Sequence, residues 1–161
     1  MTVFSPNVTP ALRSMSLVQH AGGERAELIY ELHAELDIAR ARLGVEALLN
    51  EQQTTSAHRA KATTAVSELA WNALKYAGRG VLCAWLEPLA HRQRLTLIVA
   101  DEGPGIADIS WALSDKQSSG GSLGLGLPGT KRMMDELWIR SPIKGLGYGT
   151  IVEAKLWVSH E

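Results

Sequence analysis

The sequence predicts an α+β fold, a two-layer sandwich of helices on a mixed, mostly antiparallel sheet. Segments typical of strands and helices follow each other in the order strand, helix, helix, two strands, polar loop, helix, two strands, which gathers the helices between antiparallel strands. A polar connection separates the two central strand-like runs, 81–86 and 95–100, as expected of antiparallel neighbours. A chain of 161 residues, 45% of them hydrophobic, is long enough for one domain with its own core.

The first half of the chain contains one strand-like and two helix-like segments. Residues 26–32 (AELIYEL) show the β-branched and aromatic alternation of a strand, and residues 37–50 carry a broad apolar face that fits a helix. Between residues 56 and 77 no proline or glycine occurs, and small or apolar residues recur at helical spacing. We therefore expect a long helix that stops at Gly78 and Gly80.

In the second half of the chain, the turn DEGPG directly follows the run 95–100. A short apolar-patterned piece, 106–113, precedes the polar and glycine-rich stretch SDKQSSGGS, which is hard to bury and predicts a mobile lid. Residues 125–137 have helical character, and LWIR and TIVEAKLWV follow as the last two strands, with glycine turns between them.

The N-terminal residues differ in composition from the rest of the chain. Residues 1–23 carry prolines, small polar residues and a glycine pair without sustained periodicity. We expect them to form a flexible extension without chemistry, and residues 24–161 to form the domain itself.

Composition and charge exclude several classes of function. Sixteen basic and seventeen acidic residues give a net charge of −1, so no bulk attraction to nucleic acid or to an anionic membrane is expected. The single cysteine, Cys83, excludes an internal disulfide framework and a thiolate metal site, which fits a reducing compartment. Neither a signal peptide nor a membrane span is indicated, and the expected location is the cytoplasm.

The run GGSLGLGLPGTK contains Gly124, Gly126 and Gly129 in the spelling G-x-G-x-x-G. A dinucleotide fold needs these glycines directly after a strand and an acidic residue about 20 positions later, whereas here a polar loop precedes them and position 149 is a glycine. A P-loop needs lysine directly after its last glycine, and Lys131 comes one residue late. A phosphate-binding turn before a helix and an ordinary surface loop both remain open.

The predicted helix 56–77 carries polar residues that could form a site together with this glycine run. Glu68, Asn72 and Lys75 are spaced so that they project from roughly one face of the helix. A carboxylate, a carboxamide and an ammonium group suit a proton acceptor, an oxygen ligand for Mg²⁺ and a phosphate contact. The alternative is an ordinary solvated helix face.

A second group follows the strand 95–100, where Asp101 leaves the sheet before Gly103 and Gly105. A carboxylate there can accept a hydrogen bond from an exocyclic amine, and the glycines let a flat ring lie against the backbone. The alternative is a tight turn. Thr150, at the start of the last strand, adds a hydroxyl that could donate a hydrogen bond to the same ligand.

Taken in order, these motifs resemble the GHKL superfamily of ATPases and kinases. Glu68 and Asn72 fall on its N box, the D-x-G-x-G box begins at Asp101, and Thr150 falls on its final threonine. The second glycine box falls on Gly124, Gly126 and Gly129. Within the superfamily, VSELAWNALKYAGRG and GLGLPGTKRMMDE resemble the RsbT-type serine/threonine kinases of the bacterial stressosome, and the resemblance runs from about residue 26 to residue 158.

The resemblance implies the Bergerat fold, with helices covering one face of the sheet, and an ATP site. In that site Asp101 holds the adenine amino group, Asn72 ligates Mg²⁺, Lys75 meets phosphate, and Glu68 acts as base toward a serine or threonine hydroxyl of the substrate. The segment Gly124–Gly129 cradles the phosphates. The nucleotide-binding residues implied in this way are Asn72, Lys75, Asp101, Gly103, Gly105, Gly124, Leu125, Gly126, Gly129 and Thr150.

The resemblance also implies partners. The substrates are STAS-domain proteins, namely the scaffold and the small antagonist of the stressosome, and the downstream partner is a regulator such as a PP2C-type phosphatase. Nucleic acid and membranes are not expected partners, and a homodimer is left open. The lid here reads DKQSSGG, which departs from the family's pattern, so no contacts of residues 115–123 are inferred.

Three other functions compete with this interpretation. An anti-sigma-factor kinase is disfavoured by the L-P-G-x-K-R box, and a histidine-kinase catalytic module by the lack of a preceding dimerisation helix with a phosphoacceptor histidine. A non-catalytic module that binds ATP only to regulate docking is disfavoured by Glu68, because binding alone needs no base.

Overall fold

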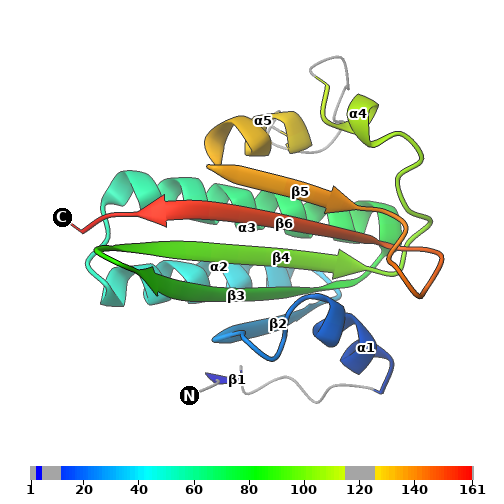
Figure 1. Ribbon diagram of the computed structural model, residues 1–161. Coiled ribbons are helices and arrows are strands. Elements are labelled where there is room, and N and C mark those ends of the chain that lie inside the picture. The colour runs from blue at the N-terminus through cyan, green and yellow to red at the C-terminus, as the bar shows by residue number, and fades with distance from the viewer. Residues whose placement is uncertain (1–2, 5–11, 115–125, 161) are drawn as a thin grey trace.

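The structure is a computed structural model that describes residues 3–4, 12–114 and 126–160 (Figure 1). Six strands form one sheet in the order β1-β2-β3-β4-β6-β5. The strands are β1 (Val3–Phe4), β2 (Leu28–Leu32), β3 (Gly80–Leu89), β4 (Arg92–Asp101), β5 (Glu136–Arg140) and β6 (Thr150–Val158). The helices are α1 (Leu12–His20), α2 (Glu35–Glu51), α3 (Ser56–Ala77), α4 (Ile109–Ala112) and α5 (Gly126–Met133).

The sheet is mixed and mostly antiparallel, as predicted. β1 runs parallel to β2, and every other neighbouring pair is antiparallel. β3 and β4 are longer than the sequence pattern indicated, because Pro88 and Gln93 still pair within the hairpin, which closes between Leu89 and Arg92. The polar connection is therefore mostly strand, with Ala90 at a φ of 56° in its tight turn.

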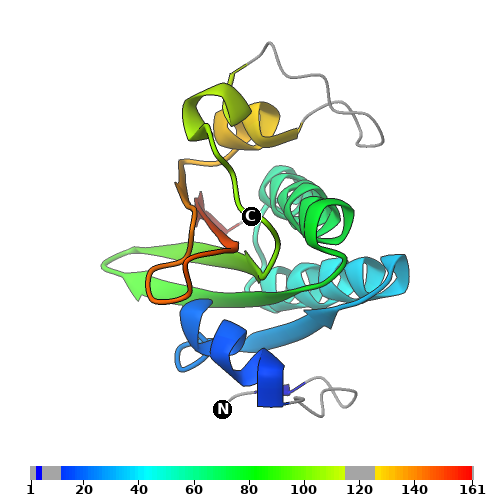
Figure 2. The same ribbon diagram turned by 90° about the vertical axis from the view of Figure 1, so that its right-hand side faces the viewer.

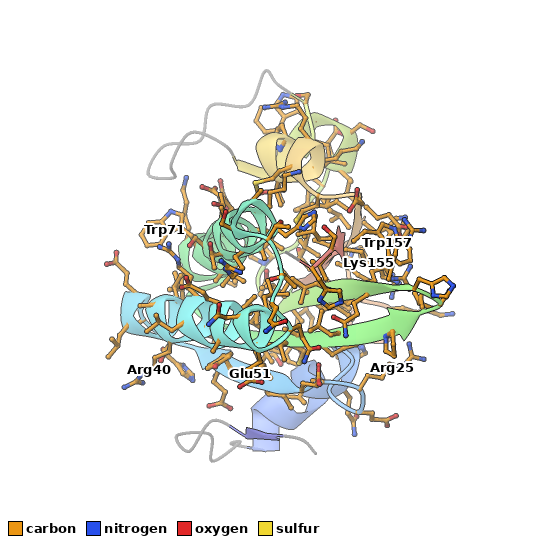
Figure 3. The ribbon with its side chains drawn as sticks, turned by 90° about the vertical axis from the view of Figure 1, so that its left-hand side faces the viewer. Arg25, Arg40, Glu51, Trp71, Lys155 and Trp157 are labelled. Atoms are coloured by element: carbon orange, nitrogen blue, oxygen red, sulfur yellow. The ribbon has the colours of Figure 1, made fainter. Side chains whose placement is uncertain are left out.

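The helices α2 and α3 cover one face of the sheet and lie side by side (Figures 1 and 2). Apolar residues of both helices pack there against alternate residues of the strands, including Leu49, Leu69, Leu82, Leu97 and Leu156. Burying this apolar surface supplies the main driving force for the fold. The other side chains of β6, such as Lys155 and Trp157, point away from α2 and α3, whereas Trp71 lies on the helix side (Figure 3).

The helix α3 begins and ends where the sequence predicts. The side chain of Thr55 accepts a hydrogen bond from the His58 backbone N–H and caps the first turn. Gly78 ends the helix with a φ of 76°, a left-handed conformation that glycine adopts without steric cost. Because both ends are fixed, the positions of Glu68 and Asn72 along the helix are fixed as well.

The N-terminal segment differs from the expectation of a flexible extension. Between residues 12 and 23 the chain forms α1 and a turn, and α1 packs on the face of the sheet opposite α2 and α3. Leu17 and Ala21 are buried there in a second apolar cluster that contains Cys83, Trp85 and Ile98. The helical pattern is too short to stand out from the sequence, and its apolar partners come from distant strands.

The predicted helix 125–137 is too long. α5 ends at Met133, and the Asp135 backbone N–H donates to the carbonyl of Lys155 before β5 begins at Glu136. Leu137 therefore belongs to the sheet, because pairing with β6 overrides the local helical pattern. The predicted lid lies almost wholly outside the described residues, since 115–125 are not described.

Cys83 is completely buried in the second cluster. Burial raises the pKa of its thiol to about 12, because an apolar environment disfavours the thiolate. Within the described residues, no helix is both long and apolar enough to span a membrane.

Replacing Leu17 by alanine tests whether α1 is part of the folded domain. Leu17 is 3% exposed, so Leu17→Ala should lower the free energy of unfolding by about 2–4 kcal/mol through a lost apolar contact and a cavity. Leu43 is 66% exposed, and Leu43→Ala is the matched control, with a change within about 0.5 kcal/mol. Urea unfolding followed by circular dichroism measures both, and equal effects of the two variants would contradict the packing of α1.

Candidate active site

A pocket of about 470 Å³ opens between α3, the segment after β4, the start of α5 and the start of β6. This volume lies within the range of small-molecule sites. Its walls are mostly apolar, and the polar groups at its surface are few. The lining residues are Asn72, Tyr76, Asp101, Pro104, Gly105, Ile106, Ala107, Asp108, Trp111, Ala112, Gly126, Leu127, Thr150 and Val152.

The carboxylate of Asp101 is a hydrogen-bond acceptor in this pocket. It stands at the end of β4, and its Oδ1 accepts a hydrogen bond of 2.9 Å from the Gly103 backbone N–H. Burial raises the pKa of Asp101, and hydrogen bonds from the backbones of Gly103 and Thr150 lower it in part. An ionised carboxylate has about four acceptor positions, so acceptor capacity remains for a ligand.

The two glycines after Asp101 keep this loop close to its neighbours. A Cβ at Gly103 would lie 2.8 Å from the Cβ of Ala77, so a side chain there would push the loop away from α3. Gly105 has a φ of +87°, which favours glycine. The predicted motif therefore has steric reasons for both glycines.

Thr150 is buried and stands opposite Asp101 in the register of β4 and β6. Its hydroxyl lies 3.1 Å from Oγ of Ser141, a residue that the sequence motifs did not single out. Ser141 also accepts a hydrogen bond of 2.7 Å from the Ile106 backbone N–H and donates one of 2.9 Å to the carbonyl of Gly149. No local signal marks Ser141, because its partners come from two separate loops.

The three polar residues predicted on α3 do not have the same environment. Asn72 lines the pocket. Glu68, one turn earlier, is only 2% exposed, is not part of the pocket wall, and accepts a hydrogen bond of 3.2 Å at Oε2 from the Gly126 backbone N–H. Lys75 is exposed outside the lining residues, with its Nζ 5.2 Å from the centre of the Tyr76 ring.

The start of α5 forms another part of the wall. Gly126 and Leu127 line the pocket, and Gly126 accepts a hydrogen bond of 2.8 Å at its carbonyl from the Thr130 hydroxyl. Gly129 is buried inside the helix and is not among the lining residues. Gly124 and Leu125, which were predicted to contact phosphate, lie outside the described residues.

No dedicated metal cage is present among residues 12–114 and 126–160. Within these ranges no group of three or more histidine, cysteine, aspartate or glutamate side chains is placed to hold a metal ion. Of the predicted site residues, five line one pocket: Asn72, Asp101, Gly105, Gly126 and Thr150. Gly103 and Glu68 do not line it, but each is hydrogen-bonded to a residue that does, Gly103 to Asp101 and Glu68 to Gly126.

Comparison with known families identifies the class of this protein. Residues 31–155 match the family described as the histidine kinase-like ATPase domain. The chain belongs to this family, which implies that it uses ATP.

The relative RsbT narrows the class further. The serine/threonine-protein kinase RsbT of Bacillus subtilis strain 168 is 40% identical over 126 residues, which cover 77% of this chain and 91% of RsbT. The chain is thus a serine/threonine protein kinase similar to RsbT.

Two solved structures resemble this chain to different degrees. The SiaB–SiaC complex from Pseudomonas aeruginosa contains a chain that matches with a TM-score of 0.55 at 12% identity, covering 93% of this chain and 99% of the other. The mycobacterial sensor histidine kinase MprB matches with a TM-score of 0.47 at 21% identity, covering 64% and 74% of the two chains. At such low identity the first of these structures supports the architecture alone.

The raised pKa of Asp101 predicts a pH dependence of stability. The folded chain keeps the Asp101 proton at pH values where the unfolded chain has lost it. The free energy of unfolding therefore falls as the pH rises from the ordinary carboxyl pKa through the raised one. Asp101→Asn removes this contribution, so its stability relative to the unsubstituted protein should increase across that interval. Urea unfolding over a pH series measures the difference, and parallel curves would contradict it.

Proposed function

We propose that the pocket binds the adenine of ATP against Asp101 and that the γ-phosphate passes to a serine or threonine of a STAS-domain protein. One observation carries this proposal. The Asp101 carboxylate and Asn72, which come from β4 and α3, line the same largely apolar pocket. A buried acceptor suits an exocyclic amine, and an amide beyond it suits a metal–phosphate group.

The residues present fit a purine nucleotide. Ile106, Leu127 and Val152 supply apolar surface for a flat ring, and the carboxylate of Asp101 supplies the polar contact that orients it. The N-terminus of α5 begins at Gly126, at the pocket. The positive end of a helix favours phosphate, and here the Gly126 N–H is already held by Glu68.

Asn72 is the residue that we assign to Mg²⁺. Magnesium needs few protein ligands, because it keeps several waters and binds substrate phosphates, and the described residues offer no carboxylate cage. When bound, the ion would spread the negative charge of the transferred phosphoryl group. Lys75 stands one turn further along α3 and would meet phosphate from the exposed side.

Glu68 is the residue that we assign as general base toward the substrate hydroxyl. Its contact with Gly126 fixes the carboxylate between α3 and the start of α5, next to the proposed phosphate position. A base has to reach the proton that it removes, and in the structure Glu68 is nearly covered. The Glu68–Gly126 contact must therefore loosen, or the substrate must approach the other carboxylate oxygen.

The partners that we propose are those that the resemblance to RsbT-type kinases implies. STAS-domain proteins, namely a scaffold and a small antagonist, would be the substrates. After phosphorylating them, the kinase would leave and bind a downstream regulator such as a PP2C-type phosphatase, in a partner switch. A homodimer is compatible with this scheme.

Phosphotransfer to a purified STAS-domain protein tests the proposed function. With γ-labelled ATP and Mg²⁺, we expect label on the STAS protein in an acid-stable form, as phosphoserine or phosphothreonine. Acid-labile phosphohistidine would favour a histidine-kinase module. ATP binding without any phosphoprotein would favour a docking module.

Glu68→Gln should separate ATP binding from transfer. Glutamine keeps an acceptor for the Gly126 N–H but cannot take a proton, so transfer should fall by about 10²–10⁴-fold while ATP affinity changes little. The exposed Glu46 provides the control Glu46→Gln, which should transfer phosphate normally. Undiminished transfer by Glu68→Gln would refute its role as base.

Asp101→Asn should weaken ATP binding by about 1–3 kcal/mol, because the carboxamide turns an acceptor position into a donor facing the amine. Asp108 also lines the pocket and caps α4, and asparagine caps helices equally well. Asp108→Asn is thus a control with the same change of charge. Isothermal titration with ATP measures both variants, and equal losses of affinity would contradict the adenine contact.

A further inference from the structure

The hydroxyl of Ser141 joins the two loops that border the pocket. Ser141 follows β5, and its Oγ lies 2.7 Å from the Ile106 backbone nitrogen, 2.9 Å from the Gly149 carbonyl oxygen and 3.1 Å from Thr150 Oγ1. Ile106 belongs to the segment after Asp101, whereas Gly149 directly precedes β6, which begins at Thr150. The Ser141 side chain thus connects two segments that contribute lining residues to the pocket, one through Ile106 and the other through Thr150.

The arrangement of these partners fixes the direction of each hydrogen bond. A serine hydroxyl has one proton and two lone pairs. The Ile106 N–H uses one lone pair, and the Ser141 proton goes to the Gly149 carbonyl. The remaining lone pair can only accept, so the proton between Ser141 and Thr150 must come from Thr150.

The opposite direction would be unfavourable. If Ser141 donated to Thr150, the carbonyl of Gly149 would lose this donor. Gly149 is buried, and leaving a buried carbonyl unpaired costs about 1–3 kcal/mol. The position of Ser141 also depends on Gly105, because a Cβ there would lie 2.9 Å from Ser141 Oγ.

Thr150 consequently offers acceptor positions to a ligand, rather than the donor that the sequence suggested. Its only proton is used by Ser141, and its oxygen keeps a lone pair at a residue that lines the pocket. Asp101, its register partner, is the other acceptor. Asp101 and Thr150 therefore both accept hydrogen bonds, and a bound molecule has to supply the donors.

We propose that Ser141 is a positioning residue that makes the site select an amino-purine over a 6-oxo-purine. This proposal rests on the proposed binding of adenine at Asp101. The exocyclic amine of adenine carries two N–H donors, which match two acceptors. A 6-oxo-purine would direct its carbonyl oxygen at the same acceptors, so that acceptor would face acceptor and neither the ligand oxygen nor the remaining lone pairs would gain a donor. Such mismatched polar groups discriminate strongly between ligands.

The test compares ATP with inosine triphosphate, which carries an oxygen in place of the amine. Titration calorimetry with the full chain should show tighter binding of ATP. In Ser141→Ala the Thr150 hydroxyl is free to donate to the 6-oxo group, so the ratio of the two affinities should fall by about tenfold, the value of one hydrogen bond. Ser141→Thr keeps the hydroxyl and should retain most of the original ratio.

Two further variants make the result unambiguous. Thr150→Val removes the acceptor itself, so it should lower the same ratio, and adding Ser141→Ala to it should change the ratio no further. Equal weakening of both nucleotides by Ser141→Ala, or an unchanged ratio, would overturn the proposal, since a purely structural role affects both ligands alike. Normal ATP affinity in Asp101→Asn would instead refute the proposed adenine site.

Discussion

The pairing of β4 with β6 is the constraint on which the site depends. Its register runs from Gln93 opposite Val158 to Asp101 opposite Thr150, so two residues far apart in sequence meet at the end of the sheet. Because side chains alternate along a strand, a slip by one residue would move Lys155 and Trp157 into the core. The apolar core between the sheet and the helices thus fixes the polar pair at the pocket.

The long helix α3 contributes residues both to this core and to the pocket. Its small and apolar residues pack on the sheet, while Glu68, Asn72 and Tyr76 follow each other at intervals of one turn along the side nearest α5 and the pocket. Burying a carboxylate such as that of Glu68 is costly unless it is hydrogen-bonded, and the Gly126 N–H supplies that bond. The same contact connects α3 to the glycine-rich segment, so protein stability and site geometry depend on shared interactions.

Sequence patterns predicted those parts of the fold that local signals determine. α3 and β6 have the predicted bounds, because a glycine or a capping residue and a sustained periodicity mark them. α1, the end of α5 and the role of Ser141 were not predicted, since each depends on contacts between distant segments. The motifs predicted one shared site for Asn72, Asp101 and Thr150, and these three residues line the same pocket. The motifs could not show that Glu68 would be buried and Lys75 exposed.

The burial of Cys83 between α1 and the sheet makes site-specific labelling of this chain possible. A thiol with a pKa of about 12 and no exposed surface does not compete for thiol-reactive probes at neutral pH. As it is also the chain's sole cysteine, one added on the surface could carry a fluorophore or spin label without any change to the native residue. Two such cysteines, one on each side of the pocket, would let the distance between two labels be followed in solution as nucleotide is added.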